Sequence, residues 1–469
     1  MPKRSRYGTC AGSSVPLGYN LCHAPAFPPN RNRRAGFQGC PNDVFAGDIL
    51  ISSLRRQFNS AFTPAAYAEL KALLAENCGG PIPFPVAETP IFIAKAFLDE
   101  MAAAGAALAR HLIADSQYLD AARNAIPPGY SVAKETPLPH FLTADFALIR
   151  TPSGTLASRL VEIQAFPSVF AYQAELCSAY RSAFQLPKSL GVFLGGLNDS
   201  TYWDLLRQTI LGSHAPDEVV LAEIDPLHQK TFPDFYLTSK RLGIPLVDIA
   251  AIEPIGNKLH YRDAAGRLRA IQRIYNRAIA DELISRHIHL PFDLSRPWEV
   301  EWAGHPNWYF LISKFSIPWL ARTGQFPVVP PAVFLDDFLE GSGEDFLASA
   351  GVPMPAGDSA SRIYSNLLLK PLFSFAGKGI EFDPTHQRLE CIPKAERGAY
   401  LLQQRMFFEP TIETPFGTTQ AEIRILYLWP ESGELTPALS LVRLGRGKMM
   451  GVDHNQNQRW VGGSAAFYM

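Results

Sequence analysis

The sequence predicts a mixed fold, α/β in its middle part and α+β toward its end, with a helical segment in front. Three observations predict it. Apolar residues recur with helical spacing up to about residue 126. Between residues 190 and 283, apolar strands alternate with helices, which is typical of a parallel, Rossmann-like sheet. From residue 366 onward the pattern changes to a hairpin and further apolar strands.

Composition and charge exclude several classes of protein. With 469 residues, the chain holds about three domains' worth of polypeptide. Its formal net charge of -1 gives no general attraction to nucleic acid or to an anionic membrane, so neither is expected as a partner. The six scattered cysteines include no Cys-x-x-Cys pair, which favours a reduced, cytoplasmic compartment. We recognise neither a membrane-length apolar run nor a secretory leader.

The first two segments differ in character. Residues 1–45 are rich in Gly, Pro, Asn and Arg and are expected to form an irregular arm. A helical segment is expected over residues 46–130, where one helix begins with Thr63 as its N-cap. The longest helix is expected over residues 89–113, and a face of small side chains indicates that it packs closely: Ala102, Ala103 and Ala106.

A hairpin over residues 140–168 carries the first candidate site. Its strands are HFLTADFALIR and TLASRLVEIQAFPS, joined by the turn TPSG. Glu162 and Gln164 lie two residues apart on the second strand and therefore face the same side. Asp145 pairs with the region around Glu162, and whether it shares that face depends on the register. Two acids and an amide oxygen suit a hard cation such as Mg²⁺; the alternative is a hairpin with exposed acids.

Residues 131–290 are expected to combine this hairpin with the Rossmann-like sheet. The expected strands are LGVFLGG, DEVVLAEIDP and IPLVDIAAI. No Gly-x-Gly-x-x-Gly follows a strand, which argues against a dinucleotide. Arg273 and Arg277 lie near the end of a strand, where ligand contacts are common in open α/β sheets. A solvated or salt-bridged pair is the alternative.

Residues 291–469 hold two conspicuous lysines. Lys314 lies in an apolar stretch, NWYFLISKFSIPWLA, which is expected to be helical, with the ammonium group reaching solvent. Lys370 ends the apolar strand of NLLLKPLFSFAGKGI, a β-hairpin with a glycine-rich, basic tip. Gly377 and Gly379 let backbone N–H groups turn toward a ligand, and Lys378 adds a positive charge, which suits a polyphosphate. A surface hairpin with solvated lysines is the alternative.

The last strands and the C-terminal segment follow. YLLQQRMFFEP and AEIRILYLWP are expected to be strands, and Glu422 and Arg424 project from one face of the second. The closing segment, LVRLGRGKMMGVDHNQNQRWVGGSAAFYM, is rich in Arg, Asn, Gln and Gly. It is expected to contribute little to a core and to form an anion-binding loop.

The order of these parts resembles the ATP-grasp fold, in which two α+β lobes clamp ATP. Lys314, LLLKP, AGKGI, YLLQQ and AEIRI follow one another as they do in that fold. The stretch DFALI…LVEIQAFPS is similar to the DF…EYNADTP stretch of glutathionylspermidine synthases and related circularly permuted ATP-grasp proteins. The resemblance spans residues 85–469. It implies a Rossmann-like pre-ATP-grasp domain followed, over residues 291–469, by a two-lobed ATP-grasp with circularly permuted order.

The resemblance also implies roles for individual residues. Mg²⁺ would be held by Asp145, Glu162 and Gln164. ATP would be contacted by Lys314 and Lys370 and covered by Gly377, Lys378 and Gly379. The adenine would be flanked, through backbone groups, by Gln403, Gln404 and Arg405. The transferring phosphoryl group would be neutralised by Lys378, Arg424 and Arg443, of which Arg424 also contacts the nucleotide. The substrate would be contacted by Arg277.

The implied activity is that of an ATP- and Mg²⁺-dependent carboxylate–amine ligase, working through an acyl-phosphate on a small-molecule, peptide or polyamine substrate. The alternatives are a phosphotransferase acting on a small acceptor and a catalytically weak nucleotide-binding scaffold. Two departures from the family matter. Gln164 replaces an asparagine and adds a methylene, which changes the metal geometry, and Thr143 stands where the synthases carry an arginine.

Overall fold

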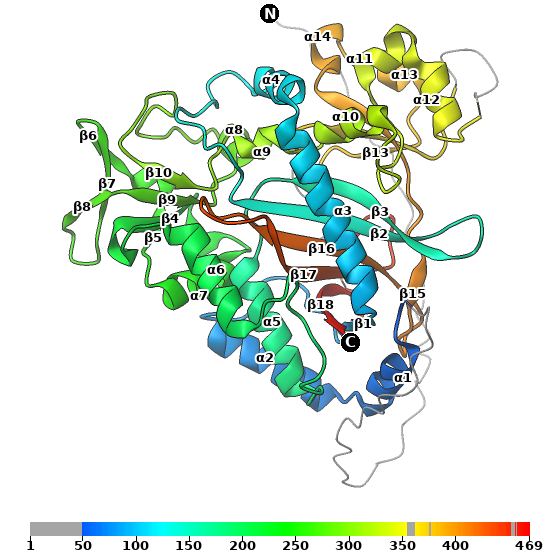
Figure 1. Ribbon diagram of the computed structural model, residues 1–469, viewed down its shortest axis with the longest axis horizontal. Coiled ribbons are helices and arrows are strands. Elements are labelled where there is room, and N and C mark those ends of the chain that lie inside the picture. Colours follow the sequence, from blue (N-terminus) through cyan, green and yellow to red (C-terminus); the bar gives the residue numbers. More distant parts are fainter. Residues whose placement is uncertain (1–48, 354–361, 375–376, 452–454, 456) are drawn as a thin grey trace, which may run out of the picture. The chain divides into compact units, whose positions relative to one another are not determined.

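The computed structural model describes residues 49–353, 362–374, 377–451, 455 and 457–469. The expected arm of residues 1–45, and residues 375–376 of the glycine-rich loop, lie outside the described residues. The described part is a mixed α/β structure that contains four sheets (Figure 1). None of its helices combines the length and the apolar character that a membrane crossing requires.

A seven-stranded sheet joins early and late parts of the chain. Its strand order is β1-β18-β17-β16-β2-β3, and β15 also pairs with β16. β1 runs parallel to β18, and the other neighbours are antiparallel. The strands are β1 (Ile91–Ile93), β2 (Phe141–Arg150), β3 (Leu156–Gln164), β15 (Pro410–Ile412), β16 (Thr419–Leu428), β17 (Thr436–Gly445) and β18 (Gly462–Tyr468).

Two helices cover this sheet, one on each face (Figure 1). Alternating residues of β16 divide between two cores: Ile423 and Ile425 pack in the core of helix α3 (Lys95–Ala114), whereas Leu426 and Leu428 pack in the core of helix α5 (Phe170–Ala183). On the α5 face, the Gln173 amide donates to the carbonyls of Ser440 and Ser464, both at 3.0 Å. The sheet is therefore buried on both sides over most of its area.

The expected Rossmann-like element is confirmed as a parallel four-stranded sheet. Its order is β10-β9-β4-β5, and all three neighbouring pairs are parallel. Its strands are β4 (Val219–Glu223), β5 (Leu246–Asp248), β9 (Arg273–Asn276) and β10 (Glu301–Ala303). A small antiparallel sheet of β6 (Glu253–Ile255), β7 (Lys258–Arg262) and β8 (Leu268–Ile271) follows β5 in the chain.

The expected lysine hairpin is also confirmed. Strands β12 (Leu367–Pro371) and β13 (Glu381–Phe382) pair antiparallel. They belong to an antiparallel sheet of order β11-β14-β12-β13, with β11 (Ala332–Phe334) and β14 (Tyr400–Gln404). Lys370 of β12 lies opposite Leu401 of β14.

The remaining helices lie between these strands. Thr63 accepts a hydrogen bond from the Ala66 N–H at 3.1 Å, so the expected N-cap is confirmed. The helices are α1 (Ser52–Ala61), α2 (Pro64–Asn77), α4 (Ser116–Asn124), α6 (Asp199–Leu211), α7 (Phe232–Leu242), α8 (Ala280–Ser285), α9 (Trp308–Leu311), α10 (Ser316–Thr323), α11 (Leu335–Asp337), α12 (Gly343–Ser349), α13 (His386–Glu390) and α14 (Lys394–Arg397).

Several sequence expectations were wrong. The helix expected over 89–113 begins only at Lys95, because Ile91–Ile93 form strand β1 beside β18. On that helix Ala102 and Ala106 are buried, but Ala103 is exposed. LGVFLGG makes isolated bridges at Gly191 and Phe193 in place of a strand. The closing segment, expected to contribute little to a core, supplies the second half of β17 and all of β18.

Candidate functional site

The register of the β2–β3 hairpin places the expected metal residues on one face. Asp145 lies opposite Glu162, and Thr143 lies opposite Gln164. A β-bulge lies directly after this pair. Phe146 is opposite Leu160, so the residue of β3 between Leu160 and Glu162 has no partner on β2. The bulge keeps Glu162 and Asp145 side by side on the face opposite α3. The question of register that the sequence left open is thereby answered.

Strands β16 and β17 bring two arginines to the same face. Arg424 is the partner of Asp145 across the β2–β16 pair, and Arg443 is the partner of Glu422 across the β16–β17 pair. Arg424 donates two hydrogen bonds to the Asp145 carboxylate, from Nε at 2.5 Å and from Nη2 at 2.6 Å, and the contact is therefore bidentate. Arg443 Nη1 adds a third contact to Asp145 at 3.1 Å and also bonds the Glu422 carboxylate.

Burial and these ion pairs set the charge states of the cluster. Burial disfavours the ionised carboxyl of Asp145, but Arg424 and Arg443 outweigh that effect and hold its pKa below the usual value. Burial raises the pKa of Glu422, although Arg443 opposes the rise. For Arg443, burial disfavours the charge, but Glu422 and Asp145 together raise its pKa. Asp145 is thus held as a carboxylate between two guanidinium groups.

Lys314 reaches this cluster from a break between two helices. The expected continuous helix is wrong: α9 ends at Leu311 and α10 begins at Ser316, and Lys314 lies in the turn between them. Its side chain does not reach solvent, since it is only 9% exposed. The ammonium donates to the Ser374 carbonyl at 2.6 Å and lies 3.7 Å from Glu162. Glu162 in turn lies 3.7 Å from Arg424 and accepts from the Gln164 amide at 3.1 Å.

Lys370 adds a fourth positive charge nearby. It is buried at the end of β12 and donates to the Gln403 side-chain carbonyl at 2.6 Å. Burial lowers the pKa of Lys370 to about 8; Glu162 acts in the opposite direction and Lys314 lowers it further. Lys370 therefore lies within electrostatic range of both groups. The cluster contains four cationic side chains and three carboxylates, so its formal net charge is +1, which favours an anion. The cations are Arg424, Arg443, Lys314 and Lys370, and the carboxylates are Asp145, Glu162 and Glu422.

The glycine-rich loop has the backbone that the sequence predicted. Gly377 and Gly379 have positive φ values of 75° and 77°, which L side chains rarely adopt. A Cβ at Gly379 would also lie 3.1 Å from Pro371. Lys378 between them is exposed. The loop is thus shaped for close approach of a ligand to backbone, but its contact with phosphates stays a prediction.

The three residues expected beside adenine occupy the end of β14. The N–H of Gln404 donates to the Pro331 carbonyl at 2.9 Å, and the N–H of Arg405 donates to the Asn366 carbonyl at 2.7 Å. These two donors are already used within the described chain. Gln403 differs, because its side-chain Nε2 is buried and has no hydrogen-bond partner among the described residues.

Arg277 lies at the carboxyl end of β9 but is engaged by the protein. Its guanidinium pairs with Asp234 of α7 at 2.7 Å and donates to the Ser168 carbonyl at 2.6 Å. Both Arg277 and Asp234 are buried. Burial raises the pKa of Asp234, and Arg277 opposes that rise. This is the salt-bridged alternative for Arg277, and its role toward substrate stays a prediction.

Sequence reasoning missed Ser168 and left Glu422 without a role. Ser168 Oγ accepts from Arg424 at 3.2 Å while its carbonyl accepts from Arg277, so it links the hairpin cluster to the parallel sheet. No sequence signal distinguishes this serine. The sequence did carry a signal for Glu422, because it lies two residues before Arg424 on a strand and its side chain therefore shares the face of Arg424.

Whether Mg²⁺ and ATP fit these residues depends on the individual donors. The Asp145 carboxylate already accepts three hydrogen bonds from Arg424 and Arg443, so most of its acceptor capacity is used within the protein. In the described part of the chain, no three His, Cys, Asp or Glu side chains converge as a metal site. A magnesium ion would therefore rest on Glu162, Gln164 and ligand oxygens. Among the described residues, Gln403 Nε2 and the buried Ser374 Oγ have no hydrogen-bond partner. Together with Lys314 and Lys370, these groups fit a polyphosphate nucleotide.

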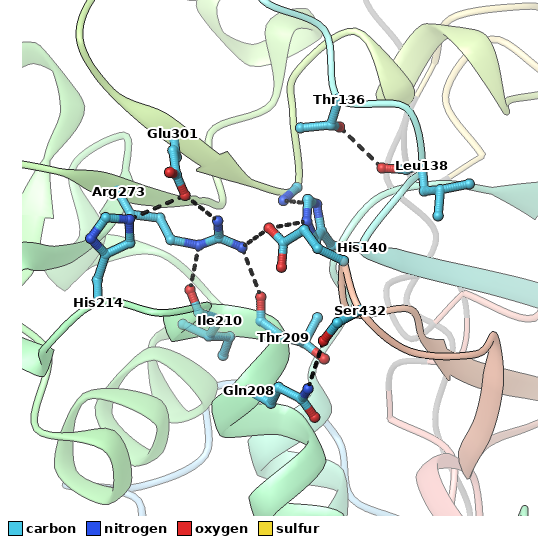
Figure 2. Close-up of polar contacts among 12 residues, drawn as sticks. Thr136, Leu138, His140, Gln208, Thr209, Ile210, His214, Arg273, Glu301 and Ser432 are labelled. Atoms are coloured by element: carbon cyan, nitrogen blue, oxygen red, sulfur yellow. Dashed lines mark hydrogen bonds and ion pairs between the residues drawn. The ribbon is translucent and has the colours of Figure 1, made fainter.

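Arg273 belongs to a different place, beside a cavity of about 770 Å³. Its guanidinium donates to the carbonyls of Thr209 and Ile210 at the end of α6 and lies between Glu301 at 2.9 Å and Glu431 at 2.6 Å (Figure 2). His140 also contacts Glu431, at 2.8 Å. His140 directly precedes β2 and lies five residues before Asp145, a separation of about 16 Å in an extended chain. Arg273 caps a helix and is not part of the candidate site.

Comparison with known proteins finds a likeness in structure but none in sequence. Neither a protein-family model nor a curated protein sequence matches the chain. A glutathione synthetase-like effector from Globodera pallida, solved in its apo form, is similar with a TM-score of 0.47 and 13% sequence identity. The match covers 92% of this chain and 100% of the effector chain. A likeness of this strength carries no argument about function.

Proposed function

We propose that this chain is an ATP- and Mg²⁺-dependent carboxylate–amine ligase of the ATP-grasp type. One observation carries the proposal. Lys314, from a later segment, lies 3.7 Å from Glu162 of the β2–β3 hairpin, and Glu162 also acts electrostatically on the pKa of the buried Lys370. Buried charges of this kind are costly unless they serve a ligand or one another. The net positive charge and the open glycine-rich loop favour a polyphosphate as that ligand.

Each residue of the proposed site has a defined task. Lys314 and Lys370 bind phosphate oxygens, and Gln403 orients Lys370 through the 2.6 Å hydrogen bond. Gly377, Lys378 and Gly379 cover the phosphates and exclude water. Arg443 and Arg424 stabilise negative charge where a phosphoryl group is transferred. ATP supplies the phosphoryl group that activates a substrate carboxylate, and Mg²⁺, held by Glu162 and Gln164, neutralises phosphate charge.

Nucleotide binding is tested by calorimetric titration of the full chain with a non-hydrolysable ATP analogue and Mg²⁺. Lys370→Met is expected to weaken binding by roughly tenfold or more, since a charge-assisted contact is lost. Lys394→Met is the matched control, because Lys394 is 79% exposed on the same part of the chain and pairs with Glu340. Equal affinities of wild type and Lys370→Met would overturn the nucleotide assignment.

The ligase reaction is tested by ADP release with pairs of carboxylates and amines, including peptides and polyamines. Release that needs both partners supports the ligase. A stable phosphorylated product would instead identify a phosphotransferase. The scaffold alternative has a specific observation in its favour, because Arg424 and Arg443 both pair with Asp145. It predicts tight ATP binding without turnover on any pair of substrates.

A further inference from the structure

A buried arginine without a full set of partners lies far from the nucleotide cluster in the fold. Arg55, on α1, is 7% exposed. Its Nη1 donates to Thr89 Oγ1 at 2.6 Å and to the Pro90 carbonyl at 2.9 Å. The guanidinium carbon of Arg55 lies 4.8 Å from the ring centroid of Phe58 and 5.5 Å from that of Phe92, so both rings pack against it. One end of the guanidinium is thus held firmly in place.

The other edge of that guanidinium has no partner. Both Nε and Nη2 are buried and make no hydrogen bond among the described residues. These two nitrogens form the side of the fork that binds a carboxylate or phosphate group with two parallel hydrogen bonds. Burial lowers the pKa of Arg55 to about 9, and the Glu413 carboxylate compensates only in part. A buried guanidinium whose bidentate edge is unpaired is costly unless an anion completes it.

A cavity of about 370 Å³ adjoins Arg55 at the start of α1. Figure 1 shows α1 beside β15, and Asn59 of α1 donates to the Glu413 carbonyl at 3.0 Å. Ile51, the N-cap of α1, provides no side-chain cap, and no acidic residue lies in the first turn. The first N–H groups of the helix and its dipole therefore favour a negative charge there. The wall also includes Arg150, Ser52 and Thr411, and the buried hydroxyl of Thr411 has no hydrogen-bond partner in the described part of the chain.

We propose that this cavity binds a small oxyanion, a carboxylate or phosphate group, on the Nε–Nη2 edge of Arg55 and the first turn of α1. The apolar side chains in its wall, among them Leu156 and Ile412, leave room for a short apolar body on the ligand. Glu413 is the one acidic side chain among the described lining residues, which also include Arg55 and Arg150. Arg150 is paired with Glu409 at 2.9 Å, so the proposed site relies on Arg55 for its positive charge. This site does not depend on the nucleotide assignment.

Thermal unfolding of the full chain tests the proposal. Sodium phosphate or sodium propionate is titrated over the millimolar range against sodium chloride at constant ionic strength. The melting temperature is expected to rise saturably with at least one oxyanion and not with chloride. The phosphate and propionate arms distinguish the two oxyanion classes. The rise is expected to persist in Lys370→Met, which removes a lysine of the nucleotide site, and in Arg56→Gln, since Arg56 is exposed on the same helix.

The rise is expected to be lost in Arg55→Met, with the apparent dissociation constant increased roughly tenfold or more. Arg55→Lys keeps a charge but not the bidentate edge, and it serves if the methionine variant does not fold. Crystals of the wild-type chain soaked in selenate give a direct view through anomalous scattering. Density within hydrogen-bond reach of Arg55 supports the site. The proposal is overturned if no oxyanion raises the melting temperature and Glu413→Gln destabilises the protein, because Glu413 would then be the anionic partner of Arg55.

Discussion

At the residue scale, Lys370 couples the proposed nucleotide site to pH. Burial brings its pKa to about 8 from the ordinary value of 10.5. The ammonium form binds phosphate, so nucleotide affinity is expected to be highest below about pH 8 and to fall, by up to tenfold per pH unit, above it. Lys370→Arg is expected to keep affinity to higher pH, because a guanidinium stays charged. Titration calorimetry from about pH 7 to 9.5 measures this dependence; a flat wild-type profile would contradict it.

The same depressed pKa affects the ligand-free protein. Because the unfolded chain holds the Lys370 proton more tightly than the folded chain, the free energy of unfolding is expected to rise between about pH 8 and 10.5. This gain in the free energy of unfolding is complete above the pKa that Lys370 has in the unfolded chain. It is lost as the pH falls through the lower pKa that Lys370 has in the folded chain. Urea unfolding across this range measures it, and Lys370→Met is expected to remove that part of the rise.

Arg443 is expected to be the critical cation for stability. Arg443→Leu leaves the buried Glu422 and Asp145 short of a guanidinium, which costs about 3–5 kcal/mol. The cost is expected to be larger at pH 7 than at pH 5, since Glu422 without its arginine takes up a proton more readily and its folded pKa rises further. Urea unfolding at both pH values measures this. The double variant Arg443→Leu Glu422→Gln recovers part of the loss; a double variant no more stable than the single one would refute the reasoning.

Residue-level prediction succeeded where a short-range rule applied. Glu162 and Gln164 share a face because strand side chains alternate, and Gly377 and Gly379 adopt the positive φ that only glycine takes easily. The partners of Asp145 were not predictable, because Arg424 and Arg443 meet it through strand pairings across 279 and 298 residues. The burial of Lys314 was missed because a helix break leaves no periodic signal.

At the element scale, the contact of α3 with the central sheet leaves no space at Gly105. An added Cβ would meet the Tyr427 hydroxyl and lie 3.0 Å from the Ala144 Cβ. Gly105→Ala is therefore expected to destabilise the protein by about 1–3 kcal/mol, despite its better helix propensity. Tyr427→Phe removes the hydroxyl, which otherwise donates to the Ala102 carbonyl at 2.9 Å. In chemical denaturation, the double variant should lose less stability than the two single losses combined; simple additivity would contradict this packing.

The prediction of elements failed mainly for short strands that lie next to a helical sequence or contain glycine and serine. Ile91–Ile93 precede a strongly helical sequence, and only pairing with β18 makes them a strand. The glycines and serine of Gly462–Tyr468 weaken any strand signal, yet that segment lies between β1 and β17 in the sheet. By contrast, the β12–β13 hairpin and the parallel strands β4 and β9 have apolar runs and turn residues that predict them directly.

At the scale of the whole molecule, β18 holds the central sheet together. It pairs with β17 on one side and with β1 on the other, and Phe467 is fully buried. Removal of Gly462–Met469 is expected to abolish cooperative folding, because β1 and β17 would both lose their partner. Phe467→Ala is the control, since a cavity there costs about 3–5 kcal/mol and leaves the strand in place. Circular dichroism with thermal unfolding distinguishes the two; cooperative unfolding of the shortened chain would contradict this role.

The mixed α/β class was predictable from the sequence, whereas the architecture of the sheet was not. Periodicity and turn residues predict each α/β unit from neighbouring residues. The seven-stranded sheet joins Ile91, Asp145 and Arg424 through pairings that no local pattern contains. The expected boundaries at residues 130 and 290 stay predictions.

The long separation between Asp145 and its arginines has a consequence during synthesis on the ribosome. Arg424 is made 279 residues after Asp145, which takes roughly 15 to 55 s at ordinary translation speeds. Throughout that interval the nascent hairpin has an open edge and a carboxylate that cannot yet be neutralised. Until strand β16 has been synthesised, β2 therefore keeps an unpaired edge, and such an edge is prone to pair with other chains.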